Sequence, residues 1–476
     1  MTLASTRFSC RCCQAETPRW VGRCPGCHEW GSLEPTAAPR GPAGAASPPV
    51  PLAEVDGRAA RPVPTGVAEL DRVLAGGLVP GSATLIYGEP GVGKSTLLLQ
   101  VLSAVAGQGA SALLVSAEES AAQVRARTAR TGEPPAALLV CDTADLSVAQ
   151  SAWRSCAPSL VVVDSVQTLA DPEVAGPAGS ISQVRSCADR LVRLAKTSGV
   201  PLILVGQVTK EGDVAGPRAL EHLVDTVLVV EGDRHHALRL LRAVKHRFGP
   251  TGEVGLFTMG EDGLVGLDDP GALLLGDRNA SVPGSAVTAL LQGRRPLVVE
   301  LQALVCPAPA GLAAGARRSV QGLDSGRLAL VLAVLEARLG LTLGALQVFV
   351  SAAGGVRATE PAMDLPLALA LTSAAEAVAL PERLVSFGEV GLAGELRHVP
   401  GADRRLAEAA RMGFTTALVP ASTVEPPRGM RAVRAATLAE AVQAVRRLAR
   451  PPIRSVRPGA GRPAGPVVAP AATGRW

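Results

Sequence analysis

The sequence is poor in aromatic residues, which make up 2% of its 476 residues and include a single tyrosine. Its cores must therefore be filled mostly by aliphatic side chains, and a hydrophobic content of 47% is sufficient for this. No apolar run reaches about 18 uncharged residues, so no transmembrane helix is predicted. The N-terminus lacks the apolar stretch of a signal peptide, and we expect a cytoplasmic protein without a membrane partner.

Lysine is also scarce. Only four of the 47 basic residues are lysines, namely Lys94, Lys196, Lys210 and Lys245. Because arginine has taken the general surface role, a retained lysine indicates a position that needs a compact ammonium group. Lys196 lies in an amphipathic stretch and is expected to be only solvated, whereas Lys210 and Lys245 are functional candidates. The net charge of +5 permits a nucleic-acid partner without requiring one.

Composition and periodicity divide the chain into five segments. Residues 1–33 hold a cysteine cluster, and an Ala-, Pro- and Gly-rich linker follows over 34–60. Alternating aliphatic runs and helical stretches over 61–270 predict an α/β domain with a mostly parallel sheet. Residues 271–450 mix short strands and helices, which predicts an α+β domain. The Pro- and Arg-rich tail over 451–476 is expected to be disordered.

Five of the nine cysteines lie within the first 27 residues. Cys10 and Cys13 form one Cys-x-x-Cys pair, and Cys24 and Cys27 form another, which is the pattern of a four-thiolate structural zinc site. A segment this short cannot bury a core, so Zn²⁺ must supply its folding energy. Cys12 is a spare thiol with the wrong spacing to Cys10. A redox dithiol would need a βαβ context that is absent here.

A glycine-rich loop with the complete form of a Walker A motif lies between a strand-like run and a helical run. The loop consists of Gly88, Glu89, Pro90, Gly91, Val92, Gly93, Lys94 and Ser95, and the helix continues with Thr96. The backbone N–H groups of such a loop face phosphate oxygens at a helix N-terminus. We therefore expect ATP binding, with Lys94 at the β- and γ-phosphates and Ser95 on Mg²⁺.

Three further predicted strands end in polar residues at the same sheet edge. Leu160–Asp164 has the form of a Walker B strand, and Asp164 is expected to hold Mg²⁺ through water, although many such aspartates only cap a turn. Glu118 is expected to polarise the attacking water, with Glu119 or a helix-capping role as the alternative. Gln207 ends the third strand, where its amide is expected to contact the γ-phosphate.

Taken together, these motifs resemble the RadA (Sms) family of bacterial DNA-repair ATPases almost from end to end. The matching stretches are the cysteine segment with residues 20–25, the loop Gly88–Ser95, and residues 117–120, 162–168, 182–185, 216–222 and 231–236. The resemblance implies a RecA-like P-loop core in a homohexameric ring that hydrolyses ATP in response to DNA. It also implies branch migration of recombination intermediates on single-stranded and branched DNA, and the RecA recombinase filament as a partner.

The family's Lys-Asn-Arg-Phe-Gly signature corresponds to Lys245–Gly249, with His246 in place of asparagine. Lys245 and Arg247 are expected to follow a strand over Leu238–Val244. As catalytic residues they would reach the γ-phosphate held by a neighbouring subunit; alternatively they would contact the DNA backbone. A solvated basic turn is the third possibility, which the rarity of lysine disfavours.

Residues 271–450 resemble the proteolytic domain of Lon. The serine position corresponds to Leu367 and the lysine position to Asp403, so the Ser–Lys dyad is missing. We therefore expect a scaffold for ring assembly and DNA contact. The leading hypothesis is a DNA-dependent ATPase. Its rivals are an ATP-dependent protease, which casein degradation tests, and an ATP-switched binding module, which DNA stimulation of ATP turnover tests.

Overall fold

The structure is a computed structural model of the whole chain. It describes residues 7–13, 15–17, 20–36, 50–54, 56–129, 132–207, 219–232, 238–267, 269–276, 278–307 and 317–449. Lys210, residues 216–218 of the 216–222 motif, residues 233–236 and the tail 451–476 lie outside the described residues, and the expectations for them stay predictions. The chain divides into two compact units, Met1–Ala59 and Ala60–Trp476.

The first unit holds a small antiparallel sheet of order β2-β1-β3. Its strands are β1 (Arg7–Cys10), β2 (Glu16–Thr17) and β3 (Leu33–Thr36). The buried apolar cluster consists of Cys10, Cys24 and Leu33. So few buried side chains cannot offset the entropy of ordering the chain, which fits a segment folded around a metal.

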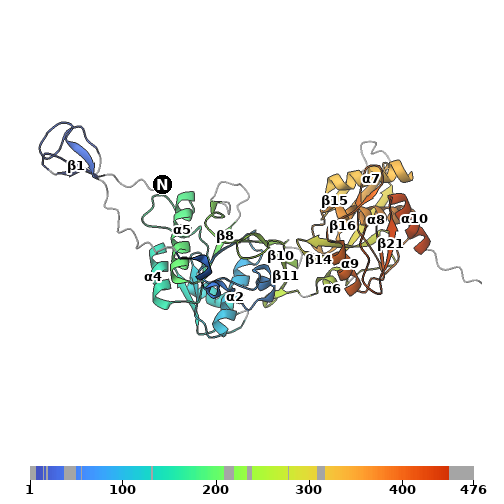
Figure 1. The fold of residues 1–476 in the computed structure, drawn as a ribbon, viewed down its shortest axis with the longest axis horizontal. Coiled ribbons are helices and arrows are strands. Elements are labelled where there is room, and N and C mark those ends of the chain that lie inside the picture. Colours follow the sequence, from blue (N-terminus) through green and yellow to red (C-terminus); the bar gives the residue numbers. More distant parts are fainter. Residues whose placement is uncertain are drawn as a thin grey trace, which may run out of the picture. The chain divides into compact units, whose positions relative to one another are not determined.

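The second unit begins with a nine-stranded sheet of order β12-β11-β10-β9-β4-β8-β7-β5-β6 (Figure 1). Its strands are β4 (Ala83–Gly88), β5 (Ala112–Ser116), β6 (Leu138–Asp142), β7 (Leu160–Asp164), β8 (Leu202–Gln207), β9 (Thr226–Glu231), β10 (Leu238–His246), β11 (Val254–Gly260) and β12 (Gly263–Gly266). The strands from β9 to β6 pair in parallel, whereas β10, β11 and β12 extend the sheet antiparallel.

Helices cover both faces of this sheet (Figure 1). One face packs against α1 (Ala68–Val73), α2 (Lys94–Gly107) and α3 (Ala121–Thr128). The other face packs against α4 (Leu146–Cys156) and α5 (Ile181–Ser198). Because side chains alternate along a strand, neighbouring residues contribute to different cores: Val227 belongs to the α5 face and Leu228 to the α2 face.

A second sheet, of order β15-β16-β14-β13-β17-β20-β21, follows in the same unit. Its strands are β13 (Ser285–Gln292), β14 (Arg295–Pro307), β15 (Arg318–Gln321), β16 (Leu346–Ala352), β17 (Leu384–Ser386), β20 (Thr416–Pro420) and β21 (Arg431–Ala435). Its helices are α6 (Pro270–Leu275), α7 (Ser325–Leu339), α8 (Asp364–Glu376), α9 (Ala402–Arg411) and α10 (Leu438–Ala449), and the hairpin β18 (Glu389–Val390) and β19 (Leu396–Arg397) pairs separately.

The two sheets share an apolar core, because Leu238 and Leu256 of the first sheet belong to the same cluster as Leu290 and Leu297 of the second. A buried ion pair reinforces this junction. Glu69 is 1% exposed and pairs with Arg295, which lies in β14. Burial of both charges makes the pair costly to break on one side.

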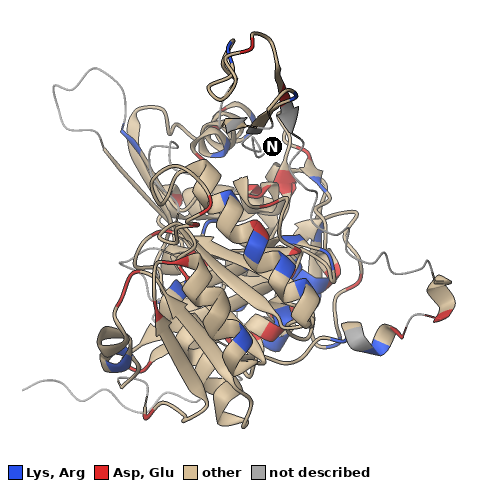
Figure 2. Cartoon of the chain, turned by 90° about the vertical axis from the view of Figure 1, so that its left-hand side faces the viewer, with Lys and Arg blue, Asp and Glu red and all other residues tan. Residues whose placement is uncertain are grey.

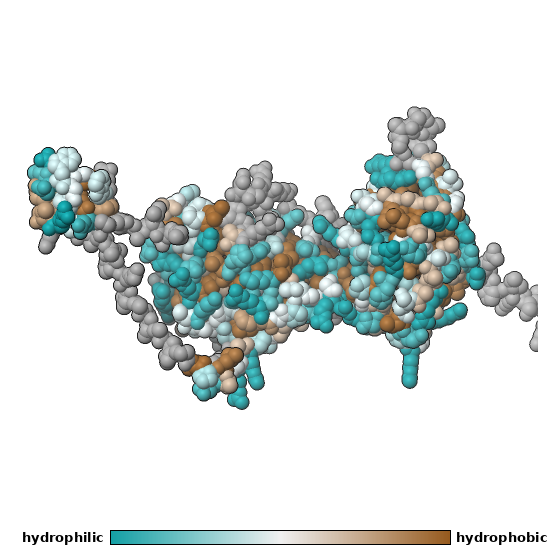
Figure 3. Space-filling model, turned by 45° about the horizontal axis from the view of Figure 1, so that its top comes forward, coloured by the Kyte–Doolittle hydropathy of each residue, from teal (hydrophilic) through white to brown (hydrophobic). Residues whose placement is uncertain are grey.

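The surface is of mixed character. Basic and acidic residues are interspersed on the helices and loops (Figure 2), and hydrophilic residues alternate with smaller apolar areas on the face shown in Figure 3. Within the described ranges, no helix is both long enough and apolar enough to span a bilayer.

Candidate nucleotide site and metal centre

The glycine-rich loop closes tightly between β4 and α2. Gly93 has a left-handed φ of 109°, and a Cβ there would lie 3.0 Å from the Met259 side chain. A Cβ on Gly88 would lie 2.4 Å from the carbonyl oxygen of Val230 on the neighbouring strand. Glycine is therefore required for the backbone to adopt this compact turn and to direct its N–H groups inward.

The Lys94 ammonium lies inside this loop. Its Nζ donates hydrogen bonds to the carbonyl oxygens of Gly88 at 2.7 Å and of Glu89 at 3.0 Å. Burial lowers the pKa of Lys94, while the nearby carboxylates of Asp164 and Glu118 act in the opposite direction. The side chain thus carries its charge to the place where a phosphate chain would meet the loop amides.

The two acid-ending strands meet at the same edge of the sheet. Ser116 pairs with Asp164 in the β5–β7 register, which places the Glu118 segment beside the end of β7. Burial raises the pKa of Asp164, and a hydrogen bond with the Ser95 hydroxyl opposes this shift. The Ser95 hydroxyl and the Asp164 carboxylate are hard oxygen ligands of the kind that Mg²⁺ takes beside a nucleotide.

The structure distinguishes the two neighbouring glutamates. Glu118 Oε1 accepts hydrogen bonds from Ser165 Oγ at 2.5 Å and from Gln207 Nε2 at 2.8 Å. Glu119 instead forms an ion pair with Arg127 at 2.9 Å. Neither glutamate caps α3, because Ser120 is the N-cap residue of that helix. Glu118 alone is therefore directed toward the sheet edge that carries Asp164.

Sequence reasoning missed two residues of this site. Ser165 contacts Glu118, as described above, although its place directly after the Walker B aspartate was a signal that could have been used. Arg239 of β10 is 5% exposed, and its Nε donates to the carbonyl oxygen of Val92 in the glycine-rich loop at 3.2 Å. This contact joins residues 147 positions apart, and no local sequence pattern predicts it.

Lys245 lies within β10, so the predicted end of that strand at Val244 is wrong by two residues. The cause is a β-bulge. Ala243 pairs with Leu228, but Lys245 pairs with Val227, which leaves Val244 as an extra residue. The bulge transfers Lys245 from the α2 face of the sheet to the α5 face, because it breaks the alternation of side chains.

On the α5 face, Lys245 Nζ donates to the carbonyl oxygens of Glu221 at 2.6 Å and of Val224 at 2.8 Å. Burial lowers its pKa, and the neighbouring Arg247 lowers it further. Arg247 donates to Asp225 at 3.2 Å and keeps more than half of its side chain exposed. The two cations thus lie together but differ in exposure.

Lys245 is remote from the glycine-rich loop of its own chain. Its partner Val227 pairs with Leu85, three residues before Gly88, which is about 10 Å along the strand. Strand β9 separates β10 from β4, which adds roughly another 10 Å across the sheet. Helix α2 also covers the opposite face, so Lys245 does not contact the nucleotide loop within one chain.

The four predicted zinc ligands are brought together in the first unit. The sulfur atoms of Cys10, Cys13, Cys24 and Cys27 all lie within 4.8 Å of one another, and Cys12 is not part of the group. Cys10 and Cys27 are separated by 3.6 Å and Cys13 and Cys24 by 3.5 Å. Sulfur atoms on a tetrahedral zinc ion with bonds of about 2.3 Å lie about 3.8 Å apart, so the group fits Zn²⁺.

Hydrogen bonds around the sulfurs support this assignment. The backbone N–H groups of Cys12 and Gly26 donate to Cys10 at 3.4 Å and to Cys24 at 3.3 Å. A hydrogen bond with the Ser32 hydroxyl holds the pKa of Cys10 at about 5. The two backbone N–H donors favour the thiolate form of Cys10 and Cys24, which is the form that binds zinc.

The positions that correspond to the Lon dyad carry neither the serine nor the lysine. Leu367 is buried in α8, and Asp403 lies in the first turn of α9. Nearby, Arg405 is 1% exposed and forms two hydrogen bonds with Glu360, at 2.6 and 2.7 Å. A buried ion pair and apolar packing thus occupy this part of the domain.

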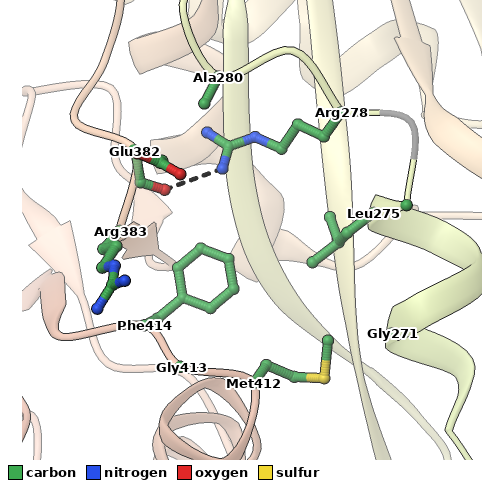
Figure 4. Close-up of a pocket in the computed structure, with 10 residues that line it drawn as sticks. Gly271, Leu275, Arg278, Ala280, Glu382, Arg383, Met412, Gly413 and Phe414 are labelled. Carbon is green, nitrogen blue, oxygen red and sulfur yellow. Dashed lines mark hydrogen bonds between the residues drawn. The ribbon is translucent and has the colours of Figure 1, made fainter.

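A cavity of about 420 Å³ lies elsewhere in this domain (Figure 4). Phe414, Met412 and Leu275 line it, and Arg278 borders it from above in the view shown, donating to the Glu382 carbonyl oxygen at 2.9 Å. Burial lowers the pKa of Arg278. No residue predicted from the sequence lines this cavity, so it is separate from the nucleotide site.

Three family models match the chain. A model described as an AAA domain matches residues 53–213, and one described as a rubredoxin metal binding domain matches residues 8–35. A third, described as subunit ChlI of Mg-chelatase, matches residues 333–423. The predicted fold class is confirmed: a RecA-like α/β P-loop ATPase core, an N-terminal four-cysteine zinc ribbon and an α+β Lon-protease-like domain.

Similar proteins cover nearly the whole chain. The DNA repair protein RadA of Mycolicibacterium smegmatis is 46% identical over 458 residues, which are 93% of this chain and 97% of that protein. The protein of the same name from Bacillus subtilis is 41% identical over 456 residues, with 93% and 99% covered. Among solved structures, a KaiC-like protein from Pyrococcus horikoshii is 21% identical with a TM-score of 0.38, and covers 44% of this chain and 99% of that one.

Proposed function

Because the chain belongs to the RadA family of DNA repair proteins, we propose that it is a DNA-dependent ATPase that acts on recombination intermediates. It would promote branch migration and strand exchange on single-stranded and branched DNA. The observation that carries the proposal is the sheet edge where Lys94, Asp164 and Glu118 converge. A cation for phosphates, an acid for a metal and a carboxylate for water are the groups that phosphoryl transfer to water needs.

We assign the roles in the ATPase site as follows. The loop amides and Lys94 bind the triphosphate, and Ser95 and Asp164 hold Mg²⁺. The ion, when bound, neutralises the charge that develops on the β- and γ-phosphate oxygens. Its positive charge would also keep Asp164 ionised despite the burial that raises its pKa. Glu118 accepts the proton of the attacking water, and Gln207, which contacts Glu118 at 2.8 Å, adjoins the γ-phosphate.

Lys245 and Arg247 act across a subunit interface in this proposal. They lie at the edge of the sheet opposite to the glycine-rich loop, so they reach a γ-phosphate only when it is held by a neighbour. Such an arrangement requires a heterologous, ring-forming contact, for which we propose a homohexamer. We also propose that the same cations contact DNA phosphates. The RecA recombinase filament is the proposed protein partner.

The Lon-protease-like domain acts as a scaffold rather than as a protease, because Leu367 and Asp403 stand where the serine and the lysine of the Ser–Lys dyad would be needed. We also propose five segments with the boundaries expected from the sequence: zinc ribbon 1–33, linker 34–60, ATPase domain 61–270, scaffold 271–450 and tail 451–476.

ATP turnover with and without single-stranded or forked DNA tests the proposal. Glu118→Gln should bind ATP and lose turnover, whereas Glu119→Gln should keep most of its rate, because Glu119 is committed to Arg127. Turnover that does not respond to DNA would favour an ATP-switched binding module. Degradation of casein by the wild-type protein would favour the protease.

A further inference from the structure

The carboxylate of Glu118 is held by two donors on the same oxygen atom. Ser165 Oγ donates to Oε1 at 2.5 Å, and Gln207 Nε2 donates to it at 2.8 Å. In the part of the chain that the structure describes, no hydrogen bond to Oε2 is found. A carboxylate arranged in this way has one oxygen fixed by the protein and the other available for a water molecule.

The two donors differ in how firmly they are held. Ser165 is fully buried, follows Asp164 directly and has a single side-chain torsion. Gln207 is only partly buried, is the last residue of β8 and has three side-chain torsions. A short buried donor therefore fixes the carboxylate with little loss of conformational entropy, whereas the longer amide adds a contact that is easier to release.

The turn around Ser165 does not depend on its hydroxyl group. The Thr168 hydroxyl donates to the Ser165 carbonyl oxygen at 2.8 Å, and the Val166 N–H donates to the Val205 carbonyl oxygen at 3.1 Å. These bonds hold the backbone in place. The hydroxyl hydrogen of Ser165 is left for Glu118, because Thr168 Oγ1 lies farther away at 3.5 Å.

We propose that Ser165 is a positioning residue for ATP hydrolysis, which fixes the Glu118 carboxylate so that Oε2 faces the attacking water. The inference rests on the proposed role of Glu118 as the general base. Without this donor, the carboxylate can rotate about its terminal torsion, which has a broad energy well. The fraction of bound ATP that meets a correctly oriented base then falls, while the phosphate- and metal-binding groups remain in place.

The first test is Ser165→Ala in the full-length protein. A hydrogen bond to a charged group corresponds to about a tenfold to hundredfold effect, so kcat should fall by that factor. The dissociation constant of a fluorescent ATP analogue and the thermal midpoint should stay close to wild type. Ser155→Ala is the matched control: it makes the same substitution at an exposed serine of α4, whose hydroxyl donates to the Ala152 carbonyl oxygen within that helix, so kcat should change by less than about threefold. Wild-type kcat in Ser165→Ala would overturn the proposal.

A double-mutant cycle separates positioning from a structural role. Single-turnover rates are measured for Ser165→Ala in the wild-type and Glu118→Gln backgrounds. If Ser165 acts through Glu118, its loss should cost nothing further once the base is gone. An equal fall in both backgrounds would refute the inference and assign Ser165 a structural role. Should Glu118→Gln itself keep full turnover, the proposed base is wrong, which is a different failure.

Discussion

The position of Lys245 predicts that two inactive variants should restore activity when mixed. Within one chain this lysine lies on the opposite face of the sheet from α2. Its strand partner Val227 pairs with Leu85, which lies about 10 Å before Gly88 along β4. If it completes the site of a neighbour, Lys245→Ala should bind ATP normally but fail to gain turnover with DNA. Glu118→Gln should fail for a different reason, since its own site lacks the base.

The size of the recovery follows from how subunits meet. An active interface needs an intact Glu118 from one subunit and an intact Lys245 from the next. In a random one-to-one mixture each condition is met half of the time, so roughly one quarter of the interfaces are complete, whatever the ring size. Loss of a trans cation lowers kcat on the order of 10³-fold, so each variant alone should contribute almost nothing.

The assay is DNA-stimulated ATP turnover after the two variants are mixed and co-assembly is verified with differently tagged subunits. Lys196→Ala is the matched control, because it removes an exposed lysine of α5 and should keep the wild-type rate. Absence of recovery in proven mixed assemblies would refute the trans role. If Lys245 instead contacts only DNA, Lys245→Ala should keep its basal rate and show weaker DNA binding with a shallower salt dependence.

Three other outcomes are expected. Lys94→Ala should abolish ATP turnover while circular dichroism stays unchanged, because the lost ammonium stabilises phosphate charge in the transition state; normal hydrolysis would contradict the assigned site. Elemental analysis should find about one zinc per chain, lost in Cys24→Ser, and metal-free protein purified without chelators would disprove the zinc assignment. Glu69→Ala should lower the free energy of unfolding by about 3–5 kcal/mol in urea titrations, since Arg295 would remain buried without its partner; a loss below about 1 kcal/mol would show that the ion pair does not secure the junction of the two sheets.

The parts that the sequence predicted well are those determined by local geometry. Glycines at fixed spacing define the loop from Gly88 to Ser95, and two Cys-x-x-Cys pairs define the four-cysteine cluster. Both patterns work within a few residues, so no knowledge of the fold is needed. The predicted parallel sheet followed from aliphatic runs in the same way.

The parts that it could not predict depend on pairing between distant segments. The contact of Arg239 with the Val92 carbonyl exists only because β10 lies beside β9, which in turn lies beside β4. The strand end at Val244 was misplaced because a bulge depends on how two strands register, not on the residues of one strand. The contact of Ser165 with Glu118 likewise requires β5 and β7 to be neighbours.

Because of the bulge at Val244, the placement of Lys245 depends on the number of residues in β10 and not on which residue stands at position 244. Val244 is 52% exposed, so other side chains should be tolerated there. Deleting it would restore the alternation and turn Lys245 toward the α2 face, away from the carbonyl oxygens of Glu221 and Val224. Across related sequences, the count of residues between Arg242 and Lys245 should therefore be preserved even where the residue at position 244 drifts.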